Sequence, residues 1–449
     1  MIYDALVGDP AVDEHFTDAA HVEEMLFVEG ALARVQAALG IIPQSAADAI
    51  SKSTKEDEYD LDALAAGAAK AGNLAIPLVK EITAHVARID ADAARYVHWG
   101  ATSQDIIDTA TVLQLRIGVQ IVADSIARAA DAAAQLAERH ATTVMAGRTW
   151  LQHATPITFG LKAAGWLAAL DRVHERVDFA LDDAMFLQFG GASGTLASYG
   201  DRGIELTAML ANELALRQSD LPWHAHRDRF ADLACALGVA VGTMGKIARD
   251  IALLSQTEVA EAFEAAEEGK GDSSAMPQKR NPVGASVVLA ASVRVPGLVA
   301  TMLAAMPNEH ERALGGWQAE WETLPRIVRL AGGAARHTAE MLGGLEVDAQ
   351  RMRANLELTQ GVSLAESVSM ALAMRIGRFD AHQTIGDASR RALAEHRPLA
   401  DVLADMPEVT EQLSRKEIER LLEPAHYLGA SATFIGDALA AHEKYRDGE

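Results

Sequence analysis

Residues 106–139 read IIDTATVLQLRIGVQIVADSIARAADAAAQLAER, and this stretch decides the fold class. Apolar residues recur along it at steps of three and four, the spacing at which side chains share one face of an α-helix. They are Val112, Leu115, Val119, Val122, Ile126, Ala130, Ala133 and Leu136. At about 1.5 Å per residue, an unbroken helix of this length reaches roughly 50 Å. A helix this long predicts a large helical bundle.

Similar patterns lie on both sides of this stretch. Residues 21–39 carry an apolar stripe with one polar interruption, Glu29, and the pattern ends at Gly40, with Pro43 following. Further long, Ala-rich patterns cover about 156–186, 228–264, 283–305 and 324–345. Strand signals are nearly absent, and no segment repeats at a fixed period. The sequence therefore predicts an all-α protein.

The C-terminal hundred residues differ from the rest of the chain. They are more charged, and their shorter helical patterns are separated by the turns HRP, DMP and EPAH. We therefore expect three domains: an N-terminal helical domain over 1–105, a central long-helix bundle over 106–347 and a C-terminal helical domain over 348–449.

Composition excludes several classes of protein. The formal net charge of −23 argues against a nucleic-acid binder, and it requires that any anionic substrate be held by a local positive pocket. A single cysteine, Cys235, excludes a disulfide framework and a multi-thiolate zinc site. Residues 1–10 lack the features of a signal peptide, and no uninterrupted apolar run reaches about 18 residues. We expect a cytoplasmic protein without a membrane span.

Three polar segments do not look like ordinary helix connections. They are Tyr96–Asp105 (YVHWGATSQD), Gly147–Pro156 (GRTWLQHATP) and Gly269–Pro282 (GKGDSSAMPQKRNP). Each is rich in hydroxyl, amide and cationic side chains, and each runs into a helical pattern. Polar loops of this content are either capped turns that face water or parts of a binding site, and three of them together favour a site.

The ends of these segments are predicted to cap helices. Thr155–Pro156 and Asn281–Pro282 fit an N-cap followed by proline at the first helical position, and Ser103 or Asp105 fits the cap of the helix near residue 106. The N-terminus of a helix attracts anions because its first N–H groups are unpaired. Three such ends in one place would bind carboxylates.

The third segment carries the groups that proton transfer requires. Gly269 and Gly271 make its start flexible, and Lys279 and Arg280 place two cations near the hydroxyls of residues 273 and 274. A serine hydroxyl is a poor base unless a positive neighbour stabilises its alkoxide. From spacing alone, a catalytic loop and a mobile basic surface loop fit equally well.

Residues 273–282, SSAMPQKRNP, resemble the signature loop of the fumarase/aspartase superfamily, Ser-Ser-x-Met-Pro-x-Lys-x-Asn. The resemblance extends over essentially the whole chain. It implies a three-domain, mostly helical chain that assembles into a homotetramer with a twenty-helix core. It also implies active sites shared between subunits, which act by addition and elimination on polycarboxylates.

Further segments resemble one branch of this superfamily, the 3-carboxymuconate cycloisomerases. They are the first two polar segments together with QFGGASG (188–194), PNEHER (307–312), WQAEWETLP (317–325) and PAHYLG (424–429). Lyases of the superfamily usually carry a His where this chain has Trp150, and many carry a Glu where it has Ser286. The loss of both partners is consistent with a cycloisomerase. Asp272 departs from the usual Gly and leaves the exact substrate in doubt.

The resemblance implies a set of site residues and no metal or organic cofactor. The catalytic residues would be Ser273, His153 and Lys279, with either Ser273 or His153 carrying the proton. Substrate-binding residues would be His98, Thr102, Ser103, Arg148, Thr149, Trp150, Gln152, Ser274, Met276, Arg280, Asn281, His310 and Arg312.

The reaction implied is the closure of 3-carboxy-cis,cis-muconate to 4-carboxymuconolactone in aromatic degradation by the β-ketoadipate pathway. Alternatives are a superfamily lyase with an adenylosuccinate-like substrate, a cycloisomerase for another muconate, and a silent scaffold of crystallin type.

Overall fold

The computed structural model describes residues 3–55, 59–266, 269, 271, 276 and 279–447. Their contacts divide the chain into two compact units, each built from separate stretches of sequence. Unit 1 comprises Met1–Ile126, Val173–Gly245 and Val287–His337, and unit 2 comprises Ala127–Arg172, Lys246–Ser286 and Thr338–Glu449. The predicted division into three domains follows continuous stretches of sequence and differs from these two units. It stays a prediction.

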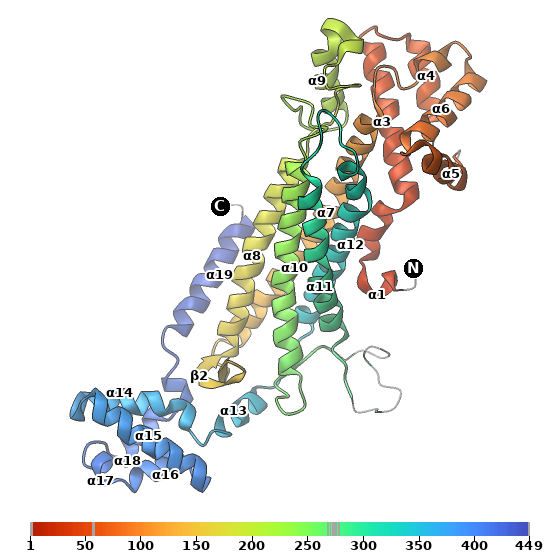
Figure 1. The fold of residues 1–449 in the computed structure, drawn as a ribbon. Helices are drawn as coiled ribbons and strands as arrows, with labels where there is room; N and C mark the ends of the chain where they lie inside the picture. Colours follow the sequence, from red (N-terminus) through yellow and green to blue (C-terminus); the bar gives the residue numbers. More distant parts are fainter. Residues whose placement is uncertain are drawn as a thin grey trace. The chain divides into compact units, whose positions relative to one another are not determined.

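Long helices dominate the chain and have residues in both units (Figure 1). They are α7 (Ser103–Arg139), α8 (Phe159–Ala184), α10 (Asp228–Leu254), α11 (Val283–Ala305) and α12 (Gly316–Gly343). The all-α prediction is confirmed. Two boundaries were predicted wrongly: α10 ends ten residues before 264, and α12 begins eight residues before 324. Pro325 lies inside α12 and does not end it. A proline removes one backbone hydrogen bond, and packing of the rest of the helix can offset this loss.

Unit 1 holds the N-terminal helices and the α9 region. Its remaining elements are α1 (Asp4–Val7), α2 (Pro10–Asp13), η1 (Glu14–Phe16), α3 (Asp18–Ala38), α4 (Gln44–Ser53), α5 (Leu61–Ala71), α6 (Ala75–Ile89), η3 (Ala93–Tyr96), η4 (Ala197–Arg202) and α9 (Gly203–Glu213). Helix α3 packs against α4 and α9, and Met25, Leu26 and Leu32 are at most 1% exposed. Burial on several faces of α3 leaves little room for polar groups, so the polar side chains inside it require specific partners.

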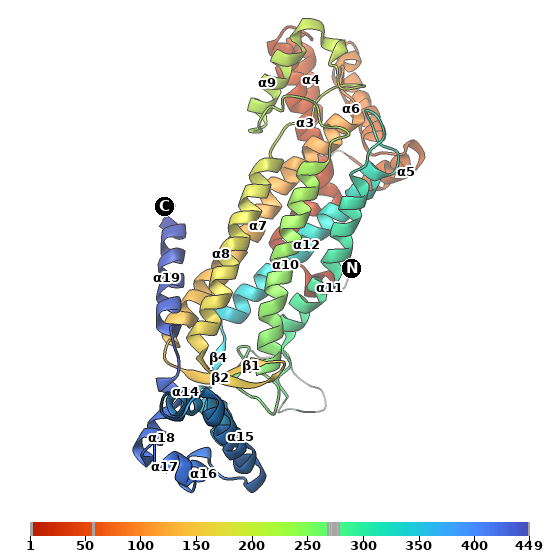
Figure 2. The ribbon, with the colours of Figure 1, turned by 60° about the vertical axis from the view of Figure 1, so that its left-hand side comes forward.

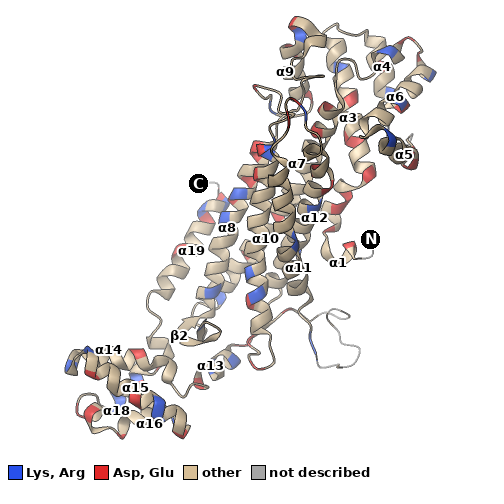
Figure 3. Ribbon diagram, viewed as in Figure 1, with Lys and Arg blue, Asp and Glu red and all other residues tan. Residues whose placement is uncertain are grey.

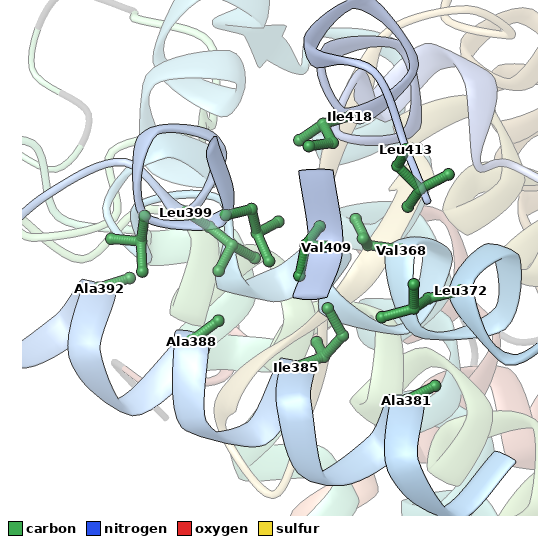
Figure 4. Close-up of a cluster of buried hydrophobic side chains, with 12 residues drawn as sticks. Val368, Leu372, Ala381, Ile385, Ala388, Ala392, Leu399, Val409, Leu413 and Ile418 are labelled. Carbon is green, nitrogen blue, oxygen red and sulfur yellow. The ribbon is translucent and has the colours of Figure 1, made fainter. Parts of the chain in front are cut away.

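Unit 2 holds the short strands and the C-terminal helices. These are β1 (Val144–Thr149), β2 (Gln152–Thr158), β3 (Ala262–Phe263), β4 (Glu346–Val347), α13 (Ala349–Glu357), η5 (Val362–Leu364), α14 (Ala365–Ile376), α15 (Arg378–Glu395), α16 (Leu399–Ala404), α17 (Pro407–Thr410), α18 (Arg415–Leu421), η6 (Pro424–His426) and α19 (Ser431–Asp447). Helices α14 to α18 enclose an apolar core of their own, in which Leu372, Ile385 and Leu399 meet (Figure 4).

The second polar segment forms a β-hairpin and not a helix cap. Strands β1 and β2 pair antiparallel, with Ala146 opposite Pro156 (Figure 2). The predicted Thr155–Pro156 cap is therefore wrong, since both residues lie in β2. Helix α8 begins at Phe159, where Oγ1 of Thr158 accepts a hydrogen bond from the N–H of Leu161 at 3.0 Å and acts as the cap.

Helices α7, α10 and α11 are long and apolar enough to cross a membrane by length and composition alone. In α7 and α10 most of the apolar window is buried inside the chain, 72% and 61%, so they are core helices. In α11 only 28% of the window is buried, although its mean hydropathy is 1.9. Helix α11 therefore carries apolar surface that its own chain does not cover.

Candidate active site

Helix α3 holds the first polar segment through two buried polar side chains, Glu29 and Gln36. Nδ1 of His98 lies 2.6 Å from Oε1 of Glu29, and Nε2 of Gln36 donates to the backbone oxygen of Trp99 at 2.8 Å. Burial by itself lowers the pKa of His98, but the charge and hydrogen bond of Glu29, with a second nearby carboxylate, outweigh burial and raise this pKa above its usual value. His98 is thus oriented and biased toward protonation.

Arg312 brings an unneutralised cation to the same segment. Its Nη1 donates to Oγ1 of Thr102 at 2.6 Å, and its Nη2 donates to the backbone oxygen of Ala192 at 2.9 Å. Both acceptors are neutral, and no carboxylate within the described ranges forms an ion pair with Arg312. A guanidinium without a counter-ion beside hydroxyl groups is suited to bind a carboxylate.

Asp105 ties this segment to a second loop. Helix α7 begins at Ser103, so the predicted cap at Ser103 or Asp105 is wrong: both residues belong to the first turn. The carboxylate of Asp105 accepts from the N–H groups of Thr102 at 3.1 Å and of Gly190 and the next residue at 2.9 Å, and Nε2 of His224 lies 2.7 Å away. Asp105 therefore pairs the N–H group that precedes α7 and joins this turn to residues 190 and 191.

A buried ion-pair network lies next to this turn in unit 1. The guanidinium of Arg227 donates to Asp108 at 2.6 and 3.2 Å and to Glu320 at 2.6 and 3.1 Å. Trp317 and Gln104 also donate to Asp108, at 2.9 and 3.0 Å. The carboxylates and the cation are all at most 4% exposed, so the network braces the helices from within.

The tip of the β1–β2 hairpin presents its side chains to solvent. Trp150 and Leu151 form the turn with positive φ angles of 52° and 63°, a conformation that costs energy for residues with a side chain. Trp150 is 95% exposed, and the flanking Thr149 and Gln152 are exposed as well. A strained turn that displays a large apolar side chain is typical of a segment selected for contact with a ligand or another chain.

Arg148 and His153 face each other across the hairpin. The guanidinium of Arg148 pairs with the buried carboxylate of Glu261 at 2.6 and 2.8 Å, and Asn355 also donates to Glu261 at 2.7 Å. Arg148 therefore braces the hairpin in this structure. Burial and then the charge of Arg148 lower the pKa of His153, and its buried Nδ1 has no partner among the described residues.

Of the residues predicted in the third segment, Ser273 and Ser274 lie outside the described residues. Gly271 and Asn281 are hydrogen-bonded to each other: the backbone N–H and Nδ2 of Asn281 both donate to the backbone oxygen of Gly271, at 3.1 and 2.9 Å. A side chain at Gly271 would meet the backbone of Asn281 at 2.5 Å, so a glycine is required there. Lys279 is exposed, with no side-chain partner in the described part of the chain.

The cap prediction at the end of this segment also changes. Glu264, and not Asn281, caps α11: its carboxylate accepts from the N–H groups of Gly284 and Ala285 at 3.0 and 2.8 Å. The predicted Asn281–Pro282 cap is wrong, because the side chain of Asn281 donates to the backbone oxygen of Gly271 and does not cap the helix. Arg280 donates to Glu346 at 3.0 Å and to the backbone oxygen of Glu264 at 2.6 Å.

The predicted site residues thus fall into two groups. Unit 1 brings together His98, Thr102, Ser103 and Arg312, with His310 exposed two residues before Arg312. Unit 2 holds the hairpin residues and the described part of the third segment, in which Met276 is exposed. Sequence reasoning missed the partners Glu29 and Glu261. The signal for Glu29 was its place as the polar interruption in an apolar stripe.

Comparison with known proteins identifies the family. The family model described as "Lyase" matches residues 7–297, and the model for the adenylosuccinate lyase C-terminus matches residues 361–438. The chain belongs to the lyase (fumarase/aspartase) family. A 3-carboxy-cis,cis-muconate cycloisomerase from Pseudomonas aeruginosa is 49% identical, over 98% of this chain and 96% of that protein.

Other lyase-family members mark how far this similarity extends. A nitrosuccinate lyase from Streptomyces davaonensis is 44% identical, over 97% of this chain and 94% of that protein. The crystal structure of 3-carboxy-cis,cis-muconate lactonizing enzyme from Pseudomonas putida has a TM-score of 0.95 and 47% identity, covering 99% of both chains. The chain therefore has the lyase-family fold, and its relatives include both cycloisomerases and lyases.

Proposed function

We propose that the chain is a 3-carboxy-cis,cis-muconate cycloisomerase that forms 4-carboxymuconolactone. The near-full-length identity of 49% to a cycloisomerase carries this proposal. Two features of the site support it: Trp150 stands at the hairpin tip where the superfamily's lyases usually carry a histidine, and Arg312 is a cation without a counter-ion among the described residues. We further propose that the enzyme acts in the cytoplasm, in aromatic degradation by the β-ketoadipate pathway.

The proposed reaction is an internal addition. One carboxylate oxygen forms a bond to an alkene carbon, and the carbon alpha to another carboxylate gains a proton. Charge builds up on that second carboxylate as it passes through an aci-form, so preorganised cations and hydrogen-bond donors lower the barrier. Because nucleophile and alkene share one molecule, the enzyme mainly fixes a reactive conformation and places one proton.

Within this mechanism the residues of the chain have separate tasks. We assign carboxylate binding to Arg312, His98, Thr102 and Ser103 in unit 1. In unit 2 we assign it to Lys279, Arg280 and Asn281, with Arg148 bracing the hairpin. The exposed tip residues Thr149, Trp150 and Gln152 would line the substrate pocket. Proton transfer is assigned to Ser273, and His153 stays its alternative.

An ultraviolet assay of the purified protein tests the reaction. Incubation with 3-carboxymuconate should remove the diene absorbance and yield the lactone, at a rate that chelator treatment leaves unchanged. Fumarate, nitrosuccinate and an adenylosuccinate-type adduct are assayed beside it. Turnover of one of these compounds, with 3-carboxymuconate left intact, would show that the chain is a lyase.

The exposed face of α11 supports a homotetramer with sites shared between subunits. Val293 and Leu303 remain 77% and 47% exposed on a helix with few polar residues, and apolar surface of this kind favours association. Light scattering should give about four times the chain mass of 47.8 kDa. A monomer that keeps full activity on dilution would contradict a shared site.

A further inference from the structure

Glu29 differs from the other acidic residues of α3 because its carboxylate is buried. Acidic residues occupy several positions along α3 (Figure 3). The structure describes every residue of this helix, and Glu29 is the buried acid among them. Burial of a carboxylate is unfavourable unless the carboxylate is paired. The side chain of Glu29 is 1% exposed and its partner is His98, whose side chain is 17% exposed. The pair therefore joins the interior to the surface of the first polar segment.

The geometry of His98 indicates a role beyond packing. Its φ angle is 55°, a left-handed conformation that is costly for a residue with a side chain and that often marks functional positions. With Nδ1 committed to Glu29 at 2.6 Å, Nε2 is the one ring nitrogen left for a ligand. Thr102, which binds the unneutralised Arg312, follows four residues later. The segment thus carries an imidazole and a hydroxyl, and the guanidinium of Arg312 is bound to that hydroxyl.

We infer that Glu29 is a positioning residue, which holds His98 as an imidazolium so that its Nε2–H binds a carboxylate of the substrate. This inference rests on the proposed function, since it assigns His98 and Arg312 to the anchoring of one polycarboxylate. A neutral His98 whose Nδ1–H still donates to Glu29 would turn the lone pair of Nε2 toward the anion. Protonation and carboxylate binding therefore favour one another.

The charges around His98 support its protonated form. Burial opposes the imidazolium, and Glu29 from α3 and Asp105 from α7 favour it and outweigh burial. Tyr199, whose hydroxyl donates to the backbone oxygen of Trp99 at 2.5 Å, stays a neutral phenol because burial and the charge of Asp105 raise its pKa. Since the pKa of His98 is raised in the folded chain, the imidazolium is present at low pH and is lost as the pH rises through that value.

The test measures binding of tricarballylate, a saturated tricarboxylate that cannot form a lactone, by calorimetry from about pH 6.5 to about pH 9. In the wild-type protein the Kd should be lowest at the acid end and should rise as His98 loses its proton. In Glu29→Gln this rise should begin at lower pH, so that binding at neutral pH weakens by about tenfold or more, the contribution of one charge-assisted hydrogen bond.

Gln36→Leu is the matched control. Gln36 lies on the same helix, is equally buried and holds the next residue of the same segment, but it carries no charge. Its loss should weaken binding without moving the pH at which the Kd rises. The inference fails if Glu29→Gln leaves that pH unchanged, if both variants give the same profile, or if the wild-type protein does not bind tricarballylate.

The assay of 3-carboxymuconate is separate from this measurement. If the pH at which the Kd rises shifts in Glu29→Gln but the protein does not turn over 3-carboxymuconate, the proposed reaction is overturned and the role of Glu29 in holding His98 stands. Turnover of 3-carboxymuconate with an unshifted pH profile in Glu29→Gln would support the proposed reaction and overturn the role of Glu29.

Discussion

Replacement of Ser273 by alanine is expected to lower kcat by on the order of 100- to 10,000-fold, the usual effect of losing a proton-transfer group. The KM should change little, because the serine acts on the reacting carbon and not on a carboxylate. Lys279 is exposed and unpaired in the described part of the loop, so its charge remains available to stabilise an alkoxide. Steady-state kinetics with 3-carboxymuconate measure both constants.

Two controls define this expectation. Ser274→Ala should be much milder, and Ser273→Ala should keep its fold and assembly, because the loss of a single hydroxyl group usually changes stability little. His153 is the rival: burial and Arg148 lower the pKa of its imidazole, so at neutral pH it is neutral and accepts a proton better than it donates one. Normal turnover in Ser273→Ala with an inactive His153→Ala would assign the proton to the histidine.

The long helices could be predicted because burial imprints its period on them. Helix α7 begins three residues before the predicted start, and α11 has the predicted bounds. The β1–β2 hairpin could not be predicted by the same reasoning. Its turn is Trp150-Leu151 where the usual signal is Asn-Gly, and a bulge at Gly147 interrupts the alternation of buried and exposed residues.

The polar partners of the site could not be predicted, because pairing is a tertiary property. His98 and Glu29 are 69 positions apart, and Arg148 and Glu261 are 113 apart. Periodicity identifies which face of a helix is buried, but it does not say which distant group a buried acid meets. Family resemblance implies which residues would face a ligand, and the structure adds the carboxylates that hold two of them, His98 and Arg148.

Replacement of Arg227 by methionine is expected to have the largest effect on stability. Asp108 and Glu320 would remain buried without their cation, and breaking a buried ion pair typically costs about 3–5 kcal/mol. Against a usual free energy of unfolding of about 5–15 kcal/mol, this is a large loss. Urea unfolding at fixed protein concentration should show a lower midpoint with an unchanged slope.

The matched control is Arg229→Met, two positions along the chain. Arg229 stacks on Phe186 at 4.3 Å and pairs with no carboxylate among the residues that the structure describes, so its loss should cost about 1 kcal/mol or less. The triple variant Asp108→Asn, Arg227→Met, Glu320→Gln should recover much of the stability, because no charge is then left buried. Equal midpoints for the two single variants would show that the network contributes only packing.

The pH dependence of the Arg227→Met defect separates charge from packing. Burial already raises the pKa of Glu320 against the opposing charge of Arg227, and without that charge this pKa rises further. The folded variant then binds more protons than its unfolded chain, so its stability should fall as the pH increases from about 5 to about 8. A lost packing contact would give the same deficit at every pH. We therefore expect the difference between wild type and Arg227→Met to grow toward pH 8, and a constant difference would contradict the ion-pair account.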